Sequence, residues 1–186
     1  MEILCFRTAS EFRLWLERNH RESDAICLRI FKKGSGVASI TYAEALDEAL
    51  CFGWIDGRKE SHDEVSWRQR FSRRRAKSGW SKINTQHVER LVAASRMSPA
   101  GLAEVEAAKK DGRWQAAYDS PKTAEVPADF VAALRKDKKA LAFFESLNKA
   151  NKYAITYRLQ TAKKPETRAK RLVALVEMMK RGEKLH

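Results

Sequence analysis

The spacing of apolar residues changes character partway along the chain. In the N-terminal part, short runs of β-branched and aromatic residues alternate with segments whose apolar residues recur every three to four positions. The first pattern is typical of strands and the second of helices. Strands are predicted at residues 3–6, 25–31, 54–59 and 65–71, and helices at 8–19 and 41–52. The order β-α-β-α-β-β indicates a small, mostly antiparallel sheet in the N-terminal half of an α+β fold.

Both N-terminal helices carry start signals. Thr8 and Glu11, and again Thr41 and Glu44, have the spacing of a capping box. In that motif the hydroxyl accepts a hydrogen bond from an amide of the first turn, and the carboxylate accepts one from the amide before the helix. The second helix is expected to stop at Gly53, because glycine tolerates the left-handed backbone that ends many helices.

The C-terminal half shows helical spacing only. Its helices are predicted at residues 88–97, with a start near Asn84, and at 98–108, 127–135, 140–147, 151–162 and 165–180. The last helix has one apolar stripe, which we expect to pack in a core, the alternative being a groove for a partner. The stripe consists of Ala169, Leu172, Val173, Val176 and Met179.

This change of pattern suggests how the chain is organised. We expect an α+β unit at residues 1–84, which contains a basic hairpin and turn, and an all-helical unit at residues 85–186. A length of 186 residues fits one compact domain. We therefore expect the helical unit to pack on the α+β unit.

Positive charge is concentrated in two blocks of the sequence. The formal net charge is +13, and residues 66–84 hold 7 basic and no acidic side chains. Residues 135–186 hold 15 basic and 5 acidic side chains. Charge concentrated in this way favours anionic partners such as nucleic acid, phosphorylated metabolites or an acidic membrane face. A solvated surface without any ligand would produce the same composition, so that alternative stays open.

Several classes of protein are disfavoured. No apolar run approaches the ~18–20 residues of a transmembrane helix. The first residues also lack the basic start and the apolar run of a secretory signal, so we expect a cytoplasmic location. Cys5, Cys27 and Cys51 are widely spaced among apolar neighbours, which favours buried, unpaired thiols over disulfides or a zinc site. Nucleotide-hydrolysing, dinucleotide-binding and zinc-protease motifs are absent. We expect no metal and no cofactor, and the question of catalysis stays undecided, with a non-enzyme favoured.

The segment Gly53–Asn84, hereafter the Trp/Arg segment, concentrates the unusual residues. On a strand, alternation places Trp67 and Phe71 on one face and Arg68 and Arg70 on the other. Arginine presents a planar fork of donors that matches phosphate or carboxylate oxygens. Amides of a Ser/Gly turn that enters a helix add to the positive field, and aromatic rings can stack a base. The predicted ligand-binding residues are Trp54, Arg70, Arg73, Arg74, Lys77, Ser78, Trp80, Ser81, Lys82 and Asn84.

The same residues have structural alternatives. The tryptophans of the segment fit core or hairpin packing, and residues 73–75 fit an ordinary exposed turn. Asp56 and His62 are the catalytic candidates, because a carboxylate or a histidine beside acids can act as an acid or base. No motif places a serine or cysteine nucleophile beside them. A second basic patch is predicted at Lys163, Lys164, Arg168 and Arg171.

Five strings of residues are distinctive in combination. They are Tyr42–Gly57, Gln69–Asn84, Met97–Leu102, Gly112–Ser120 and Ala162–Arg168. Together they resemble the YdeI/OmpD-associated family, also labelled bacteriocin-protection proteins, over nearly the whole length. The resemblance implies a link to porin expression or to tolerance of bacteriocins and cationic peptides, and it brings no established catalytic residues. Because the first residues carry no export signal, such protection is expected to be indirect or regulatory.

The leading hypothesis is an intracellular binding protein for an anionic partner, with nucleic acid ahead of a phosphorylated small molecule. Arg70, Arg73, Arg74 and Lys77 would neutralise phosphates, Ser78 and Ser81 would donate hydrogen bonds, and Trp80 would stack on the ligand or form a wall of the site. One alternative is an enzyme that acts on a small phosphorylated or carboxylated substrate. Another is a stress-tolerance adaptor that binds a protein. The oligomeric state is left open.

Overall fold

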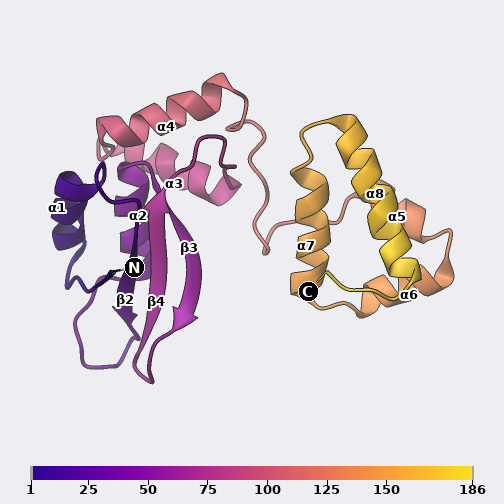
Figure 1. The fold of residues 1–186 in the computed structure, drawn as a ribbon, viewed down its shortest axis with the longest axis horizontal. Coiled ribbons are helices and arrows are strands. Elements are labelled where there is room, and N and C mark those ends of the chain that lie inside the picture. The colour runs from indigo at the N-terminus through magenta and orange to yellow at the C-terminus, as the bar shows by residue number, and fades with distance from the viewer. Residues whose placement is uncertain (1, 186) are drawn as a thin grey trace. The chain divides into compact units, whose positions relative to one another are not determined.

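The chain folds into two compact units. A computed structural model of the protein describes residues 2–185 (Figure 1). Unit 1 comprises the chain up to Trp80 together with Asn84–Gln115, and unit 2 comprises Ser81–Ile83 and the chain from Ala116 onward. The sequence pattern placed the start of the helical unit at residue 85. Unit 1 instead extends to Gln115 and so includes the first two helices of that predicted unit. The packing of both parts into one domain stays a prediction.

A four-stranded sheet organises unit 1. Its strands are β1 (Ile3–Leu4), β2 (Ala25–Phe31), β3 (Trp54–Ser61) and β4 (Ser66–Arg73). They lie in the order β1-β2-β4-β3, and β1 pairs with β2 in parallel while the other two pairings are antiparallel. The predicted α+β class with a small, mostly antiparallel N-terminal sheet is thus confirmed.

The two faces of this sheet differ in chemistry. On one face Ile26 pairs with Phe71 and Leu28 with Gln69, and all four side chains are buried. The ring of Phe12, from the first helix, lies 6.0 Å from that of Phe71. On the opposite face Cys27 pairs with Arg70 and Arg29 pairs with Arg68, and these four side chains are only partly buried. The alternation along β4 therefore separates a helix-covered apolar face from a partly exposed basic one.

Four helices complete unit 1. They are α1 (Ala9–Asn19), α2 (Tyr42–Cys51), α3 (Lys82–Ala93) and α4 (Pro99–Lys110). The capping box at Thr41 and Glu44 is complete. At α1 the Thr8 hydroxyl accepts from the Glu11 amide, but the Glu11 carboxylate accepts from the amide of Arg7 instead of Thr8. Gly53 follows α2 with a φ of 73°, the left-handed conformation expected of it.

Unit 2 is helical apart from its connections. Its helices are α5 (Ala128–Leu134), α6 (Lys138–Ser146), α7 (Lys149–Gln160) and α8 (Pro165–Lys180). Their buried side chains, including Phe130, Phe144 and Leu159, form one apolar core. Val176 and Met179 of the predicted stripe belong to it, whereas Val173 is 60% exposed and lies outside it. Ala169 is exposed as well, so the prediction was wrong at Val173 and at Ala169, and fewer residues of the stripe are buried than the apolar pattern predicts.

Two expectations about surface and membrane can be compared with the structure. Cys51 is buried and Cys27 is partly buried, but Cys5 is exposed, so the prediction that all three thiols are buried was wrong at Cys5. Cys5 lies just beyond the end of the two-residue strand β1. Within residues 2–185 no helix combines the length and the apolar character needed to cross a membrane.

Candidate functional site

A β-bulge positions Arg70 on the basic face of the sheet. Asp56 pairs with Phe71 and Lys59 with Gln69, so Gly57 and the residue after it both oppose Arg70. Gln69 Nε2 donates a 2.8 Å hydrogen bond to the carbonyl oxygen of Gly57, which the bulge removes from the regular ladder. A Cβ at Gly57 would lie 3.6 Å from the Arg70 side chain. The aliphatic part of Arg70 therefore packs along the backbone of the bulge.

Arg29, Arg68 and Arg70 form what we call the basic sheet face. Arg29 pairs with Asp63 at 2.7 Å, and Arg68 pairs with Glu60 at 3.3 Å. Arg70 forms no ion pair with any residue in the described range 2–185, and its Nε is buried without a hydrogen-bond partner. Two of the three guanidinium groups are thus neutralised within the protein, and the third is not.

The turn after β4 uses several predicted ligand-binding residues internally. Arg74 is 7% exposed, its guanidinium lies 3.4 Å from the centre of the Trp80 ring, and it donates to the carbonyl oxygen of Gly79 at 3.2 Å. Trp80 is 1% exposed, and its ring also lies 5.0 Å from that of Trp114. A ligand that stacks on Trp80 would have to displace Arg74.

The other predicted residues of unit 1 lie in varied surroundings. Trp54 is fully buried and donates its indole N–H to the carbonyl oxygen of His20 at 3.2 Å. Arg73 pairs with Asp24. Asn84 is 8% exposed, within α3. Trp54 and Arg73 are thus held by contacts within the protein, and Asn84 is buried. The burial of Trp54 agrees with the alternative that the tryptophans pack in the core.

Exposed cations remain at the tip of the same turn. Arg75 and Lys77 are exposed, and Lys77 has a φ of 72°, which is unusual for a residue with a side chain. Ser78 closes the turn with a 2.9 Å hydrogen bond from its amide to the carbonyl oxygen of Arg75. Its own carbonyl oxygen accepts a 3.0 Å bond from Arg113, which is 8% exposed and paired with Asp111. Arg113 thus holds the turn in place, a role the sequence pattern missed.

The predicted ligand-binding residues are divided between the two units. Ser81 and Lys82 belong to unit 2, where Ser81 bridges to Tyr118 and Lys82 pairs with Asp119 at 2.8 Å. The other predicted ligand-binding residues belong to unit 1. The Trp/Arg segment therefore contributes to both units.

The two catalytic candidates are not brought together. Asp56 accepts a 2.8 Å hydrogen bond from the hydroxyl of Tyr42, and burial together with Asp56 raises the pKa of that hydroxyl. His62 lies beyond the other end of β3, with its Nε2 4.0 Å from Asp63. Within residues 2–185, Asp56 forms no ion pair with an arginine, and its side-chain hydrogen-bond partner is Tyr42.

The second predicted patch is partly neutralised within unit 2. Arg168 forms two hydrogen bonds with the Asp129 carboxylate, at 2.6 and 2.9 Å, and Arg171 donates to the carbonyl oxygen of Arg158 at 2.7 Å. Lys163 and Lys164 are exposed. Lys163 and Lys164 are therefore the members of this patch whose charged groups are most exposed to solvent.

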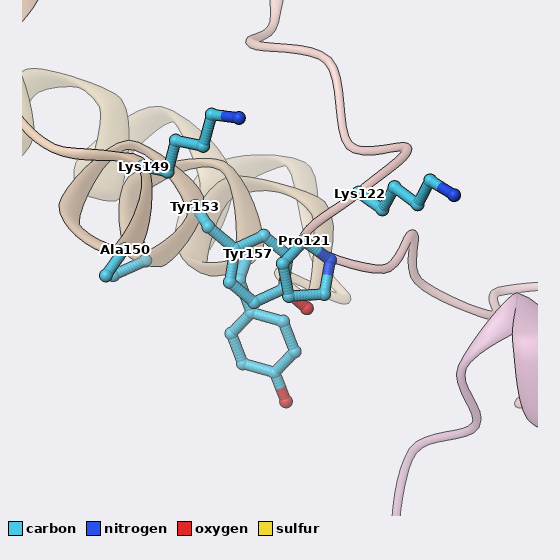
Figure 2. Close-up of a pocket in the computed structure, with 7 residues that line it drawn as sticks. Pro121, Lys122, Lys149, Ala150, Tyr153 and Tyr157 are labelled. Carbon is cyan, nitrogen blue, oxygen red and sulfur yellow. The ribbon is translucent and has the colours of Figure 1, made fainter.

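A groove in unit 2 was missed by the sequence reasoning. It has a volume of about 670 Å³ and is lined by Pro121, Lys122, Lys149, Ala150, Tyr153, Ala154 and Tyr157 (Figure 2). The available signal was the spacing of Lys149, Tyr153 and Tyr157, every fourth residue on one side of α7. The pattern did not reveal that the loop before α5 supplies the opposite wall.

The tyrosines of the groove belong to an aromatic cluster. The Tyr157 ring lies 4.9 Å from that of Tyr118, edge to face, and 6.0 Å from that of Tyr153. The Tyr153 hydroxyl donates to the carbonyl oxygen of Asp119 at 3.1 Å. Burial, followed by the neighbouring tyrosines and Asp119, raises the pKa of the Tyr153 hydroxyl. The cluster holds both rings of α7 in defined positions.

In a comparison with known proteins, the two units match the models of two different families. The chain belongs to the family described as a domain of unknown function (DUF8412), whose model matches residues 4–104. Residues 123–182 match the family described as Bacteriocin-protection, YdeI or OmpD-Associated, which confirms the suspected family for this part of the chain, whereas the strings Tyr42–Gly57, Gln69–Asn84 and Met97–Leu102 lie in the part matched by the other model. No curated protein and no solved structure matches the chain. The family name supplies a link to bacteriocin protection, and the biochemical function is not established.

Proposed function

We propose that this protein binds an anionic partner through the basic sheet face, with nucleic acid ahead of a phosphorylated small molecule. The observation that supports this proposal most directly is the partly exposed guanidinium of Arg70, which has no carboxylate partner among the residues that the structure describes. A phosphate would supply the acceptor that the neighbouring arginines find in Asp63 and Glu60. Arginine suits this role because its planar donors match phosphate oxygens.

The turn that follows β4 extends the proposed surface. Arg75 and Lys77 are exposed there, and residues 66–84 contain no acidic side chain. Arg74 and Trp80, which the sequence pattern assigned to the ligand, are given a structural role in this proposal because they pack on one another. Arg70, Arg75 and Lys77 are the side chains that would contact phosphates. Contacts of this kind position a nucleic acid without reading its sequence.

Salt dependence provides the first test. Three phosphate contacts predict a log–log slope of about −3 against salt, since each neutralised phosphate on duplex DNA contributes ~0.9. Affinity for a fluorescein-labelled 20-base-pair duplex should therefore fall by roughly 40-fold between 50 and 200 mM salt, measured by anisotropy. Arg70→Gln should reduce the slope by about 1 and weaken binding to duplexes of different sequence equally.

A matched variant separates a local effect from a change of net charge. Arg18→Gln removes the same charge from an exposed position on α1, the helix that packs on the other face of the sheet. It should leave the affinity close to that of the unchanged protein. Lys77→Gly is a second informative variant, because glycine suits a φ of 72° and the change removes a cation without straining the turn. Equal losses from R70Q and R18Q, or no duplex binding at 50 mM salt, would rule out the proposed surface.

A further inference from the structure

The groove in unit 2 has the size and lining of a site for a small, flat molecule. Its volume of about 670 Å³ falls within the ~300–1,000 Å³ typical of small-molecule sites. Ala150 and Ala154 lie one turn apart on α7 and leave room above the helix. The rings of Tyr153, Tyr157 and Pro121 form much of the remaining lining, as Figure 2 shows. These are mostly apolar surfaces on which a planar ring can lie.

The rim of this groove is positively charged. Lys122 comes from the loop before α5 and Lys149 from the first residue of α7, and Figure 2 shows both side chains extending from the rim. Among residues 2–185, none of the residues that line the groove is acidic. Neither lysine forms an ion pair with another residue of the described chain. Two unneutralised ammonium groups beside exposed rings favour a ligand that carries negative charge at one end and an aromatic ring at the other.

We propose that this groove binds a free mononucleotide, with its base against Tyr157 and its phosphate between Lys122 and Lys149. Tyr157 is suited to the base because 38% of its surface is exposed while its contacts with Tyr118 and Tyr153 hold the ring in place. Stacking of a base on an aromatic side chain tolerates different bases. The site goes beyond the basic sheet face, since all of its residues belong to unit 2 and none of them is needed for binding at Arg70.

Calorimetric titration of the full chain with adenosine monophosphate tests whether ring and phosphate act together. Adenosine lacks the phosphate and ribose 5-phosphate lacks the base. Each should bind at least about tenfold more weakly than the nucleotide, because ribose 5-phosphate loses the stacking of the base and adenosine loses the charge-assisted contacts of the phosphate. Uridine monophosphate should bind within about tenfold of adenosine monophosphate, since stacking is tolerant of the base. Absence of nucleotide binding, or adenosine that binds as tightly as its monophosphate, would overturn the assignment.

Variants of the lining residues connect such binding to this groove. The double change Lys122→Gln and Lys149→Gln should weaken nucleotide binding by roughly tenfold or more, as expected for two lost charge-assisted contacts. Its matched control is Lys138→Gln with Lys184→Gln, two exposed lysines of unit 2 that do not line the groove. Tyr157→Phe should keep the affinity, and Tyr157→Ala should lose it. If the lysine pair and its control behave alike, the groove is not the site.

Two further measurements separate this inference from the proposed function. Arg70→Gln should leave nucleotide binding unchanged, and the Lys122/Lys149 double variant should leave the affinity for duplex DNA within about twofold, because duplex contacts are proposed in unit 1. Loss of nucleotide binding in the Arg70 variant alone would place the nucleotide at the sheet face and overturn the groove site. If a single-stranded oligonucleotide of six nucleotides binds the groove more tightly than the mononucleotide, the occupant of the groove is single-stranded nucleic acid and not a free nucleotide.

Discussion

Changing Glu48 to Gln is expected to lower the free energy of unfolding of unit 1 by about 2–3 kcal/mol, one of the two largest effects anticipated for a single substitution. Glu48 is 3% exposed, and its two carboxylate oxygens accept hydrogen bonds from different arginines. Arg13 Nη1 lies 3.0 Å from one oxygen, and Arg96 binds the other. One buried carboxylate therefore compensates two cations from separate parts of unit 1.

The size of the expected loss follows from the surroundings of the three groups. Breaking a fully buried ion pair costs about 3–5 kcal/mol, because a charge is left without compensation. The side chains of Arg13 and Arg96 are 32% and 39% exposed, so water can partly replace the lost carboxylate. A smaller value than the full penalty is therefore expected. Arg13 also donates to the carbonyl oxygen of Arg96 at 3.1 Å, a bond that the substitution leaves available.

Urea denaturation followed by tryptophan fluorescence measures this effect selectively. The chain contains 5 tryptophans, and all of them lie within the sequence ranges of unit 1. Glu17→Gln is the matched control, because Glu17 pairs with the same Arg13 at 3.4 Å but is 46% exposed. It should change the free energy of unfolding by less than about 0.5 kcal/mol, as is usual for exposed helix pairs. Similar losses from both variants would show that burial of Glu48 is not the cause.

Changing Gly101 to Ala is expected to destabilise unit 1 by about 2–3 kcal/mol, although alanine is the better helix former by ~1 kcal/mol. A Cβ at this position would lie 2.2 Å from the carbonyl oxygen of Cys51 and 2.9 Å from the end of Met97. The Cys51 oxygen also accepts hydrogen bonds from the amide and hydroxyl of Ser98, at 3.0 and 2.7 Å. The added methyl group would thus clash with backbone that the N-terminal cap of α4 holds in place, and α4 would have to move away from α2.

Gly112→Ala separates a steric clash from a general cost of replacing glycine. Gly112 has a φ of 78°, and no atom of the described residues lies within 4 Å of its added Cβ, so only backbone strain of roughly 1 kcal/mol is expected there. Gly101 has no positive φ and should nevertheless lose more. The same urea titration compares the two variants. A Gly101→Ala protein as stable as the unchanged chain would show that α4 can shift at little cost.

Local signals accounted for most of the elements because their physical causes are local. The predicted ranges of β2 and α8 agree with the observed Ala25–Phe31 and Pro165–Lys180, since alternation and an N-terminal proline act within a few residues. The start of α3 was predicted near Asn84, within two residues of the observed Lys82, but its end was predicted at residue 97 and lies at Ala93. The first turns of α3 are polar, and they bury Asn84 and Thr85 instead of apolar side chains. Apolar spacing alone predicted only the part of this helix from Val88 onward.

The candidate sites needed more than local signals. Arg70 and Arg74 are both arginines of one basic run, yet one lies on a partly exposed sheet face and the other covers a buried tryptophan. Their difference depends on the bulge at Gly57 and on the position of Trp80, which are set by pairing and packing between distant residues. The groove in unit 2 likewise requires the loop at Pro121 to lie against α7.

By itself the sequence determined the α+β class, the alternation along β4, most helix boundaries, the concentration of charge and the family resemblance. Each of these depends on neighbouring residues or on composition. Tertiary structure alone decided which cations are neutralised, because Asp24, Asp63 and Asp129 reach their arginine partners from far along the chain. It also decided that Trp80 is enclosed while Tyr157 is exposed, since burial depends on which elements pack together.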